Sequence, residues 1–238
     1  MANTYFSFKE FIVHQDKTAM KVGTDGVLLG AWANCDKAKK ILDIGSGTGL
    51  ISLMLAQRTE NAAIDAIEID DSAFGQMQQN FELSPWKNRL TSIHMDFKHY
   101  STTSGNKYEL IVSNPPFFIN SLKNECNKKS LARHTDSLSF AELISGIDML
   151  LAENGIFCVI LPATEKSSFI ELAKTSGLNL TRCLYIKPTP SKPAKRILME
   201  FSLSKSVCIE EEIIIEDSGR HGYSNEYKEL TKDFYLAF

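Results

Sequence analysis

The sequence has few of the features that mark secreted, membrane-spanning or metal-stabilised proteins. Its five cysteines are odd in number and widely spaced, and none stands in a Cys-x-x-Cys pair, so neither a disulfide framework nor a zinc knuckle is indicated. Its five histidines show no metal-ligand spacing, and we expect no bound metal. The sequence has no run of about 18 apolar residues and no basic N-terminal segment leading into an apolar one. These absences predict a protein of the reducing cytoplasm with no membrane partner.

An excess of positive charge is also missing. The 238 residues include 26 Lys and Arg against 29 Asp and Glu, a net charge of -3, so the field of the whole molecule does not favour nucleic acid. A polyanion would have to bind at a local basic cluster. The length indicates one large domain with appendages, a monomer by default. We expect an N-terminal cofactor cover over residues 1–34, a core over 35–204 and a C-terminal strand and helix appendage over 205–238.

From about residue 40 onward, short β-branched segments alternate with helical ones, which predicts an α/β fold with a doubly wound, mostly parallel sheet. The last two predicted strands are separated by a loop that contains Pro188, Pro190 and Pro193. Three prolines in so short a loop exclude a crossover helix, so these strands must be antiparallel neighbours and one strand is reversed. The predicted strands cover 40–44, 62–69, 90–95, 108–113, 156–161, 180–186 and 196–203, and the predicted helices cover 48–58, 72–83, 139–152 and 163–175.

The segments outside this alternation are expected to add smaller elements. Residues 8–14 alternate like a strand, and Thr24 and Asp25 are expected to cap a helix over 26–33. The acidic tail over 209–238 is interpreted as a solvated appendage that balances the charge away from the substrate. Asn154-Gly155 is expected to end the helix that starts at 139. Ser224 is expected to cap the start of a terminal helix.

The strongest local signal is Asp43-Ile44-Gly45-Ser46-Gly47-Thr48-Gly49, where a buried strand turns into a helix. Glycines let the backbone turn sharply and approach a ligand at the carboxyl ends of the strands. Glu68 ends the next strand, where a carboxylate can accept hydrogen bonds from both ribose hydroxyls of a nucleoside cofactor. The glycine spacing is not the GxGxxG of a pyrophosphate site, and the carboxylate of Asp43 would repel phosphate and attract a sulfonium. The turn therefore favours S-adenosylmethionine over NAD, with Gly45, Gly47 and Gly49 as backbone contacts.

A further acidic residue follows the third strand of the core. Asp96 reaches the same crevice edge, where its carboxylate could accept the amino hydrogens of the cofactor adenine. Phe97 would then stand beside the adenine as an apolar wall. Taken without context, an Asp at a strand end is more often a turn former.

The segment Ser113-Asn114-Pro115-Pro116-Phe117-Phe118 directly follows an apolar strand. The two prolines hold Asn114 and Pro115 in extended geometry, so that two oxygens project at the strand end. An exocyclic amine is a poor nucleophile because its lone pair is delocalised into the ring. Accepting both of its hydrogens, at the Asn114 side chain and the Pro115 carbonyl, favours the pyramidal nitrogen that forms during methyl transfer. Phe117 offers a face on which the base can stack.

Together these motifs resemble those of class I S-adenosylmethionine-dependent methyltransferases of the amino-methylating type, over about residues 40–204. That resemblance implies a Rossmann-like, seven-stranded sheet in the order 3-2-1-4-5-7-6, with the last strand reversed. A closer resemblance, to the bacterial tRNA1(Val) (adenine-N6)-methyltransferases, implies that the substrate is the adenine directly 3′ of the anticodon. It rests on His14-Gln15-Asp16-Lys17, on residues 20–32, on Ala132-Arg133-His134 and on Asp233-Phe234-Tyr235-Leu236. In that family residues 20–32 cover the cofactor, which makes Lys21, Gly23, Thr24 and Asp25 candidate cofactor contacts.

Two loops that leave the carboxyl ends of strands carry local positive charge and are expected to flank the base pocket, which supports RNA as the partner. The same amine-binding motif would serve guanine N2 of rRNA, N6 of a DNA adenine or N5 of a protein glutamine. A cofactor-sensing or NAD-binding module without transfer chemistry would leave Asn114 and its prolines without a role. The candidate RNA contacts are Lys128, Lys129, Arg133 and His134 in the first loop and Lys192, Lys195 and Arg196 in the second.

Overall fold

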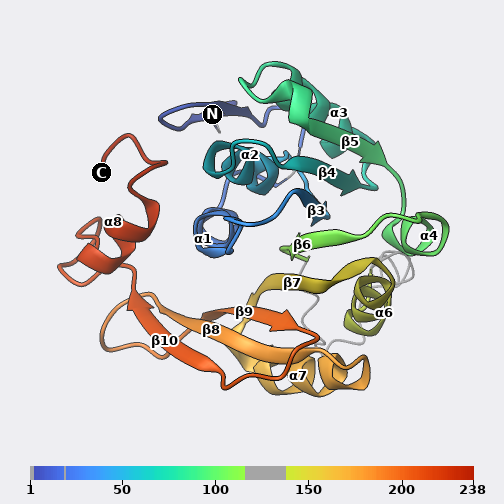
Figure 1. The fold of residues 1–238 in the computed structure, drawn as a ribbon. Coiled ribbons are helices and arrows are strands. Elements are labelled where there is room, and N and C mark those ends of the chain that lie inside the picture. Colours follow the sequence, from blue (N-terminus) through green and yellow to red (C-terminus); the bar gives the residue numbers. More distant parts are fainter. Residues whose placement is uncertain (1–2, 19, 116–137) are drawn as a thin grey trace, which may run out of the picture.

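An eight-stranded sheet forms the centre of the computed structural model, which describes residues 3–18, 20–115 and 138–238 (Figure 1). Its strands are β3 (Lys40–Ile44), β4 (Ala63–Glu68), β5 (Leu90–His94), β6 (Tyr108–Ser113), β7 (Leu151–Pro162), β8 (Asn179–Lys187), β9 (Arg196–Ser202) and β10 (Ile209–Ile214). They lie in the order β10-β8-β9-β7-β6-β3-β4-β5. Without β10, and read from β5, this is the order 3-2-1-4-5-7-6 implied by the class I resemblance.

The reversed strand is confirmed as β9, which runs antiparallel to both of its neighbours, β7 and β8. The other neighbouring pairs of the sheet are parallel. The loop with three prolines makes the turn between β8 and β9. A backbone hydrogen bond from Lys195 N to Ile186 O, 2.9 Å long, closes that turn. The absence of room for a crossover helix in this loop was therefore sufficient to predict the reversed strand.

The prediction of seven strands is wrong by one, because β10 pairs in parallel with β8. Its acidic run resembles a solvated tail because an edge strand leaves one side of its backbone and many side chains in water. The tail was expected to balance the charge away from the substrate, but part of it lies beside the second basic loop. The carboxylate of Glu212 lies 3.4 Å from the ammonium of Lys187, where that loop begins. The carboxylate of Glu210 lies 3.1 Å from the ammonium of Lys166 on α7.

Helices cover both faces of the sheet, as expected for a doubly wound fold. On one face, Leu28 and Ile51 pack against Ile41 and Val112 of the sheet. On the other face, Ile144 and Phe169 are buried in a second cluster. The helices are α1 (Thr24–Trp32), α2 (Leu50–Arg58) and α3 (Asp71–Glu82), followed by α4 (Phe97–Thr103), α6 (Phe140–Leu150), α7 (Lys166–Thr175) and α8 (Asn225–Thr231), with short 3-10 helices at Lys87–Arg89 and Ala163–Glu165.

The helix after β6 ends earlier than predicted, and the helix after β5 was not predicted. The helix expected to reach residue 152 ends at Leu150, and Asn154-Gly155 lies within β7 rather than at a helix cap. Gly155 is required there by close packing, because a Cβ atom would lie 2.8 Å from the carbonyl oxygen of Tyr108. Helix α4 was not predicted at all, and it begins directly after Asp96.

The N-terminal segment forms a hairpin of β1 (Tyr5–Ser7) and β2 (Ile12–His14), so the single strand predicted over 8–14 is wrong. Phe8 and Phe11 stack within the turn, with ring centroids 4.7 Å apart. Burying this aromatic pair favours the turn over a continuous strand.

The C-terminal segment packs against this hairpin. Ser224 caps α8 as predicted, and its hydroxyl accepts a hydrogen bond from Tyr227 N at 3.0 Å. Beyond α8, Phe234 is buried in a cluster that includes Phe8. The ammonium of Lys9 donates to the Phe238 carbonyl oxygen at 2.7 Å. The two ends of the chain therefore support each other on one side of the sheet. Among the described residues, no helix has the length and apolar character needed to cross a bilayer.

Candidate functional site

Three candidate residues lie at one level of the sheet, at the carboxyl ends of neighbouring strands. Ile44 of β3 pairs with Ile67 of β4 and with Ser113 of β6. The next residue on each strand is therefore Gly45, Glu68 or Asn114. With strands about 4.8 Å apart, the backbones at residues 114 and 68 stand about 10 Å from each other on either side of the glycine turn. The structure thus brings the predicted cofactor and catalytic segments to a single edge.

The glycine turn leaves open space above its first two glycines. Gly45 and Gly47 have φ angles of 68° and 58°, in the left-handed region, and a Cβ atom built on either would meet nothing within 4 Å. Gly49 differs, because a Cβ there would lie 2.5 Å from Cε1 of Phe81. Gly45 and Gly47 can therefore approach a ligand, whereas Gly49 allows α2 to pack closely on α3.

Asp43 is fully buried, and its Oδ2 atom accepts hydrogen bonds from Ser52 N at 3.1 Å and Ser52 Oγ at 2.7 Å. Its other carboxylate oxygen, Oδ1, has no hydrogen-bond donor among the described residues. Burial raises the pKa of this carboxyl from 3.8 to about 7, although the bonds from Ser52 favour the charged form. Asp43 is thus a carboxyl with one oxygen held at the start of α2 and one able to accept a further donor. Ser52 was not predicted, because a serine within an apolar helix gives no signal of its contact.

Glu68 supports the glycine turn directly. Its Oε2 accepts the N–H of Gly47 at 2.8 Å, and its Oε1 accepts the N–H groups of Ile69 and Asp70, each at 2.8 Å. A carboxylate offers about four acceptor positions, so these bonds leave about one on Oε2. The binding of ribose hydroxyls by Glu68 stays a prediction, and about one acceptor position is open to them while these backbone bonds persist.

The two candidates after β5 have structural roles. Asp96 is the N-cap of α4, and its Oδ1 accepts the N–H of His99 at 3.1 Å. Phe97 is 5% exposed and lies in the core, where a Cβ on Gly146 would come within 2.5 Å of its ring. The prediction of Phe97 as a wall beside the cofactor is corrected, because the ring fills the contact between α4 and α6. Asp96 follows β5 at the carboxyl-end edge of the sheet, where it caps α4.

The expected cover candidates do not share one location. The ammonium of Lys21 donates to the carbonyl oxygens of Gln15 and Thr18, which holds it within the N-terminal segment. The prediction that Thr24 and Asp25 cap α1 is wrong, because Gly23 is the N-cap residue and no side chain caps the helix. Asp25 instead accepts from Arg196 Nε at 2.7 Å, and Thr24 lies beside it on α1.

A buried amide that the sequence did not reveal joins the N-terminal segment to the glycine turn. Asn80 of α3 is 1% exposed, and its Nδ2 donates to the carbonyl oxygens of His14 and Thr48 at 2.9 and 2.8 Å. Its Oδ1 accepts the N–H of His14 at 2.9 Å. Asn80 escaped prediction because a polar residue on an amphipathic helix suggests the solvent face.

The segment after β6 is described only in part. Asn114 is half-buried and Pro115 is buried, directly beyond the last paired residue of the strand. The hydroxyl of Ser113 donates to the Ile44 carbonyl at 3.0 Å and ties this strand end to β3. Phe117 and the RNA candidates Lys128, Lys129, Arg133 and His134 lie outside the described residues.

The second basic loop carries less available charge than its sequence suggests. The ammonium of Lys187 lies 3.4 Å from the carboxylate of Glu212, and Arg196 is paired with Asp25. Lys192 and Lys195 are exposed. The loop therefore offers two exposed ammonium groups beside two ion pairs.

The strand order, the reversed β9 and the glycine turn after β3 define the class I methyltransferase fold. A predicted O-methyltransferase of Agrobacterium tumefaciens has the same fold, with a TM-score of 0.67 at 18% identity over 88% of this chain and 96% of that chain. The Methyltransferase small domain family matches residues 19–139. Two curated relatives match almost the whole chain, and both are called tRNA1(Val) (adenine(37)-N6)-methyltransferase. The relative from Flavobacterium psychrophilum is 49% identical and covers 97% of this chain and 99% of its own, and the relative from Bacteroides fragilis is 47% identical and covers 99% of each. This chain belongs to the tRNA1(Val) (adenine(37)-N6)-methyltransferase family.

Proposed function

We propose that this protein transfers the methyl group of S-adenosylmethionine to the exocyclic N6 of adenine 37 in tRNA1(Val). The observation that carries the proposal is the placement of Asn114 and Pro115 beside the glycine turn. The full-length match to relatives that bear this activity in their names supports the choice of substrate.

The residues present suit the methyl donor. The unpaired Oδ1 of Asp43 can accept a hydrogen bond from an ammonium group, and the open space above Gly45 and Gly47 admits a ligand against the backbone. The remaining acceptor position on Glu68 Oε2 suits one ribose hydroxyl. When bound, S-adenosylmethionine supplies an electrophilic methyl group on a positively charged sulfur. Lys21, Gly23 and Thr24 have no comparable support as donor contacts.

The chain's own contribution to the chemistry is to prepare the amine. The Asn114 side-chain oxygen and the Pro115 carbonyl each accept one N6 hydrogen, which withdraws the nitrogen lone pair from the ring and directs it at the methyl group. One N–C bond forms as the S–C bond breaks, and the surplus proton leaves to solvent. Phe117 remains the predicted stacking partner of the adenine.

We assign residues 1–34 to a cover over the donor and 205–238 to an appendage of the core. The bonds of Asn80 to His14 and Thr48 support the first assignment, since they join the N-terminal segment to the donor turn. Pairing of β10 with β8 supports the second. A tRNA substrate suits a cytoplasmic enzyme, and the bases of an anticodon loop are already unpaired, so extruding one costs little.

Labelled donor offered to separate pools of tRNA, rRNA, DNA and protein tests the substrate class. We expect label in tRNA, recovered as N6-methyladenosine, and its loss when adenine 37 of a tRNA1(Val) transcript is replaced by guanine. Label in guanine, in DNA or in glutamine would select one of the alternative acceptors and refute the proposal.

The variant Asn114→Ala tests the catalytic step. We expect the single-turnover rate to fall about 10²-fold or more, because a positioned acceptor in the transition state is lost. Donor affinity, measured by calorimetry, should be unchanged. A variant with nearly wild-type rate would remove Asn114 from the reaction.

A further inference from the structure

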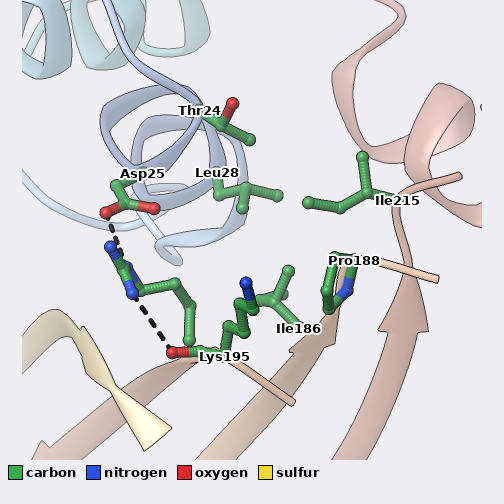
Figure 2. Close-up of a pocket in the computed structure, with 8 residues that line it drawn as sticks. Thr24, Asp25, Leu28, Ile186, Pro188, Lys195 and Ile215 are labelled. Atoms are coloured by element: carbon green, nitrogen blue, oxygen red, sulfur yellow. Dashed lines mark hydrogen bonds and ion pairs between the residues drawn. The ribbon is translucent and has the colours of Figure 1, made fainter. Parts of the chain in front are cut away.

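A small pocket opens between the start of α1 and the ends of β8, β9 and β10 (Figure 2). Its apolar lining comes from Leu28, Ile186, Pro188 and Ile215, and its volume is about 180 Å³. Sites for whole drug-sized ligands are typically about 300–1,000 Å³, so this pocket admits a group no larger than a nucleobase. It is too small for the complete methyl donor.

The polar side of the pocket carries a net positive charge. Thr24, Asp25, Lys195 and Arg196 complete its lining. The carboxylate of Asp25 is balanced by Arg196, whose Nε donates to it at 2.7 Å. Lys195 therefore adds one positive charge to the lining, and this residue is exposed. An apolar floor beside a cation suits a nucleobase, which can bury its faces there, attached to a phosphate, which the ammonium attracts.

The register of the sheet places this pocket near the proposed reaction. Asn114 follows Ser113, which pairs with Val159 of β7, and Pro162 of β7 pairs with Arg196 of β9. Arg196 is thus two strands across and two residues further along than Asn114. With strands about 4.8 Å apart and a rise of about 3.3 Å per residue, the two backbones are about 12 Å apart along the same edge.

We infer that this pocket is a binding subsite for one unpaired nucleotide of the RNA that neighbours the target adenine. The inference rests on the proposed function, and it names a second contact that fixes which adenine reaches Asn114. The base packs on Leu28, Ile186 and Ile215, and its edge meets the Thr24 hydroxyl at the rim. Its phosphate lies near the ammonium of Lys195. Thr24 is thereby assigned to RNA rather than to the methyl donor.

Abasic substitutions test the subsite. Transcripts of tRNA1(Val), each lacking the base at one anticodon-loop position other than 37, are titrated against wild type and Ile215→Trp, which fills the pocket. For wild type we expect one position at which loss of the base weakens binding about tenfold, because the base no longer buries its faces against the apolar floor. In Ile215→Trp the intact RNA should bind about tenfold more weakly, and the same abasic change should then have little further effect.

Two lysines of the same loop provide a matched comparison. Lys195→Ala should lower the slope of log Kd against log salt by about 1, because it removes a phosphate contact. Lys192 is also exposed but lies outside the pocket lining. In Lys192→Ala, removal of the base should therefore weaken RNA binding as much as it does in wild type. Thr24→Phe, which narrows the pocket from an exposed position, serves in place of Ile215→Trp if that variant melts at a lower temperature than wild type.

Equal abasic penalties in wild type and in the filled variant would overturn the subsite, as would a wild type that tolerates every abasic position. Methylation of adenine 37 is measured in the same samples. If adenine 37 is still methylated but the abasic change weakens binding equally in wild type and in the filled variant, only the subsite is refuted. If wild type neither binds nor methylates the tRNA, the proposed function fails with it.

Discussion

Asp43 should make the stability of this protein depend on pH in a direction opposite to that of most carboxyl groups. Burial raises its pKa from 3.8 to about 7, so between these values the native state holds a proton that the unfolded chain has lost. The native state is therefore favoured most below the unfolded pKa. The stabilisation that comes from protonated Asp43 declines as pH rises above the unfolded pKa, and it is lost once pH exceeds the folded pKa.

The size of the effect follows from the two pKa values. Integrating the proton difference between about pH 5 and pH 8 gives a loss of about 2–3 kcal/mol in the free energy of unfolding. Asp43→Asn keeps the shape of the side chain and removes the titration. Urea unfolding of both proteins across this range isolates the contribution of Asp43, because the other titrating groups cancel in the difference.

Ser52→Ala provides a control with a predicted direction. The Ser52 hydroxyl donates to Asp43 at 2.7 Å and lowers the pKa of that carboxyl. Without it the pKa of Asp43 should rise further, and the loss of stability should extend to higher pH. Stability curves for wild type and Asp43→Asn that remain parallel from about pH 5 to pH 8 would refute the account of a buried, proton-binding carboxyl.

Two other substitutions examine the packing around the donor turn. Gly49→Ala should lower the free energy of unfolding by about 2–4 kcal/mol, because its φ is 82° and its Cβ would clash with Phe81; a loss below about 1 kcal/mol in urea would contradict that packing. Asn80→Ala should cost about 3 kcal/mol and speed hydrogen exchange at residue 14, because the polar groups of His14 and Thr48 lose their buried partner. Unchanged exchange at residue 14 would show that the N-terminal segment is held by other contacts.

Much of the core could be predicted because its signals are local. β3 and β6 begin and end at the predicted residues, since each is a short apolar run bounded by turn formers. The reversal of β9 followed from three prolines in one loop. The glycine turn after β3 was recognisable because positive φ angles at Gly45 and Gly47 require glycine, which leaves a direct mark in the sequence.

Two of the errors came from contacts between residues far apart in the chain. Phe97 could not be assigned to the core from its position after a strand, because that depends on Gly146 of α6. The ion pair of Asp25 with Arg196 joins residues separated by 171 positions, so the expected helix cap was not available. Phe97 and Asp25 each have an ordinary local sequence signal, and a contact with a distant residue overrides it.

The sequence by itself determined the class of fold, the place of the glycine turn and the end of β6 at the Asn-Pro-Pro segment, because glycine and proline restrict the backbone wherever the chain folds. Only the tertiary structure decided that Asp43 is buried with a pKa near neutrality, that β10 completes the sheet and that a charged pocket forms beside α1. These features depend on desolvation and on pairing between distant segments, which arise only when the elements pack together.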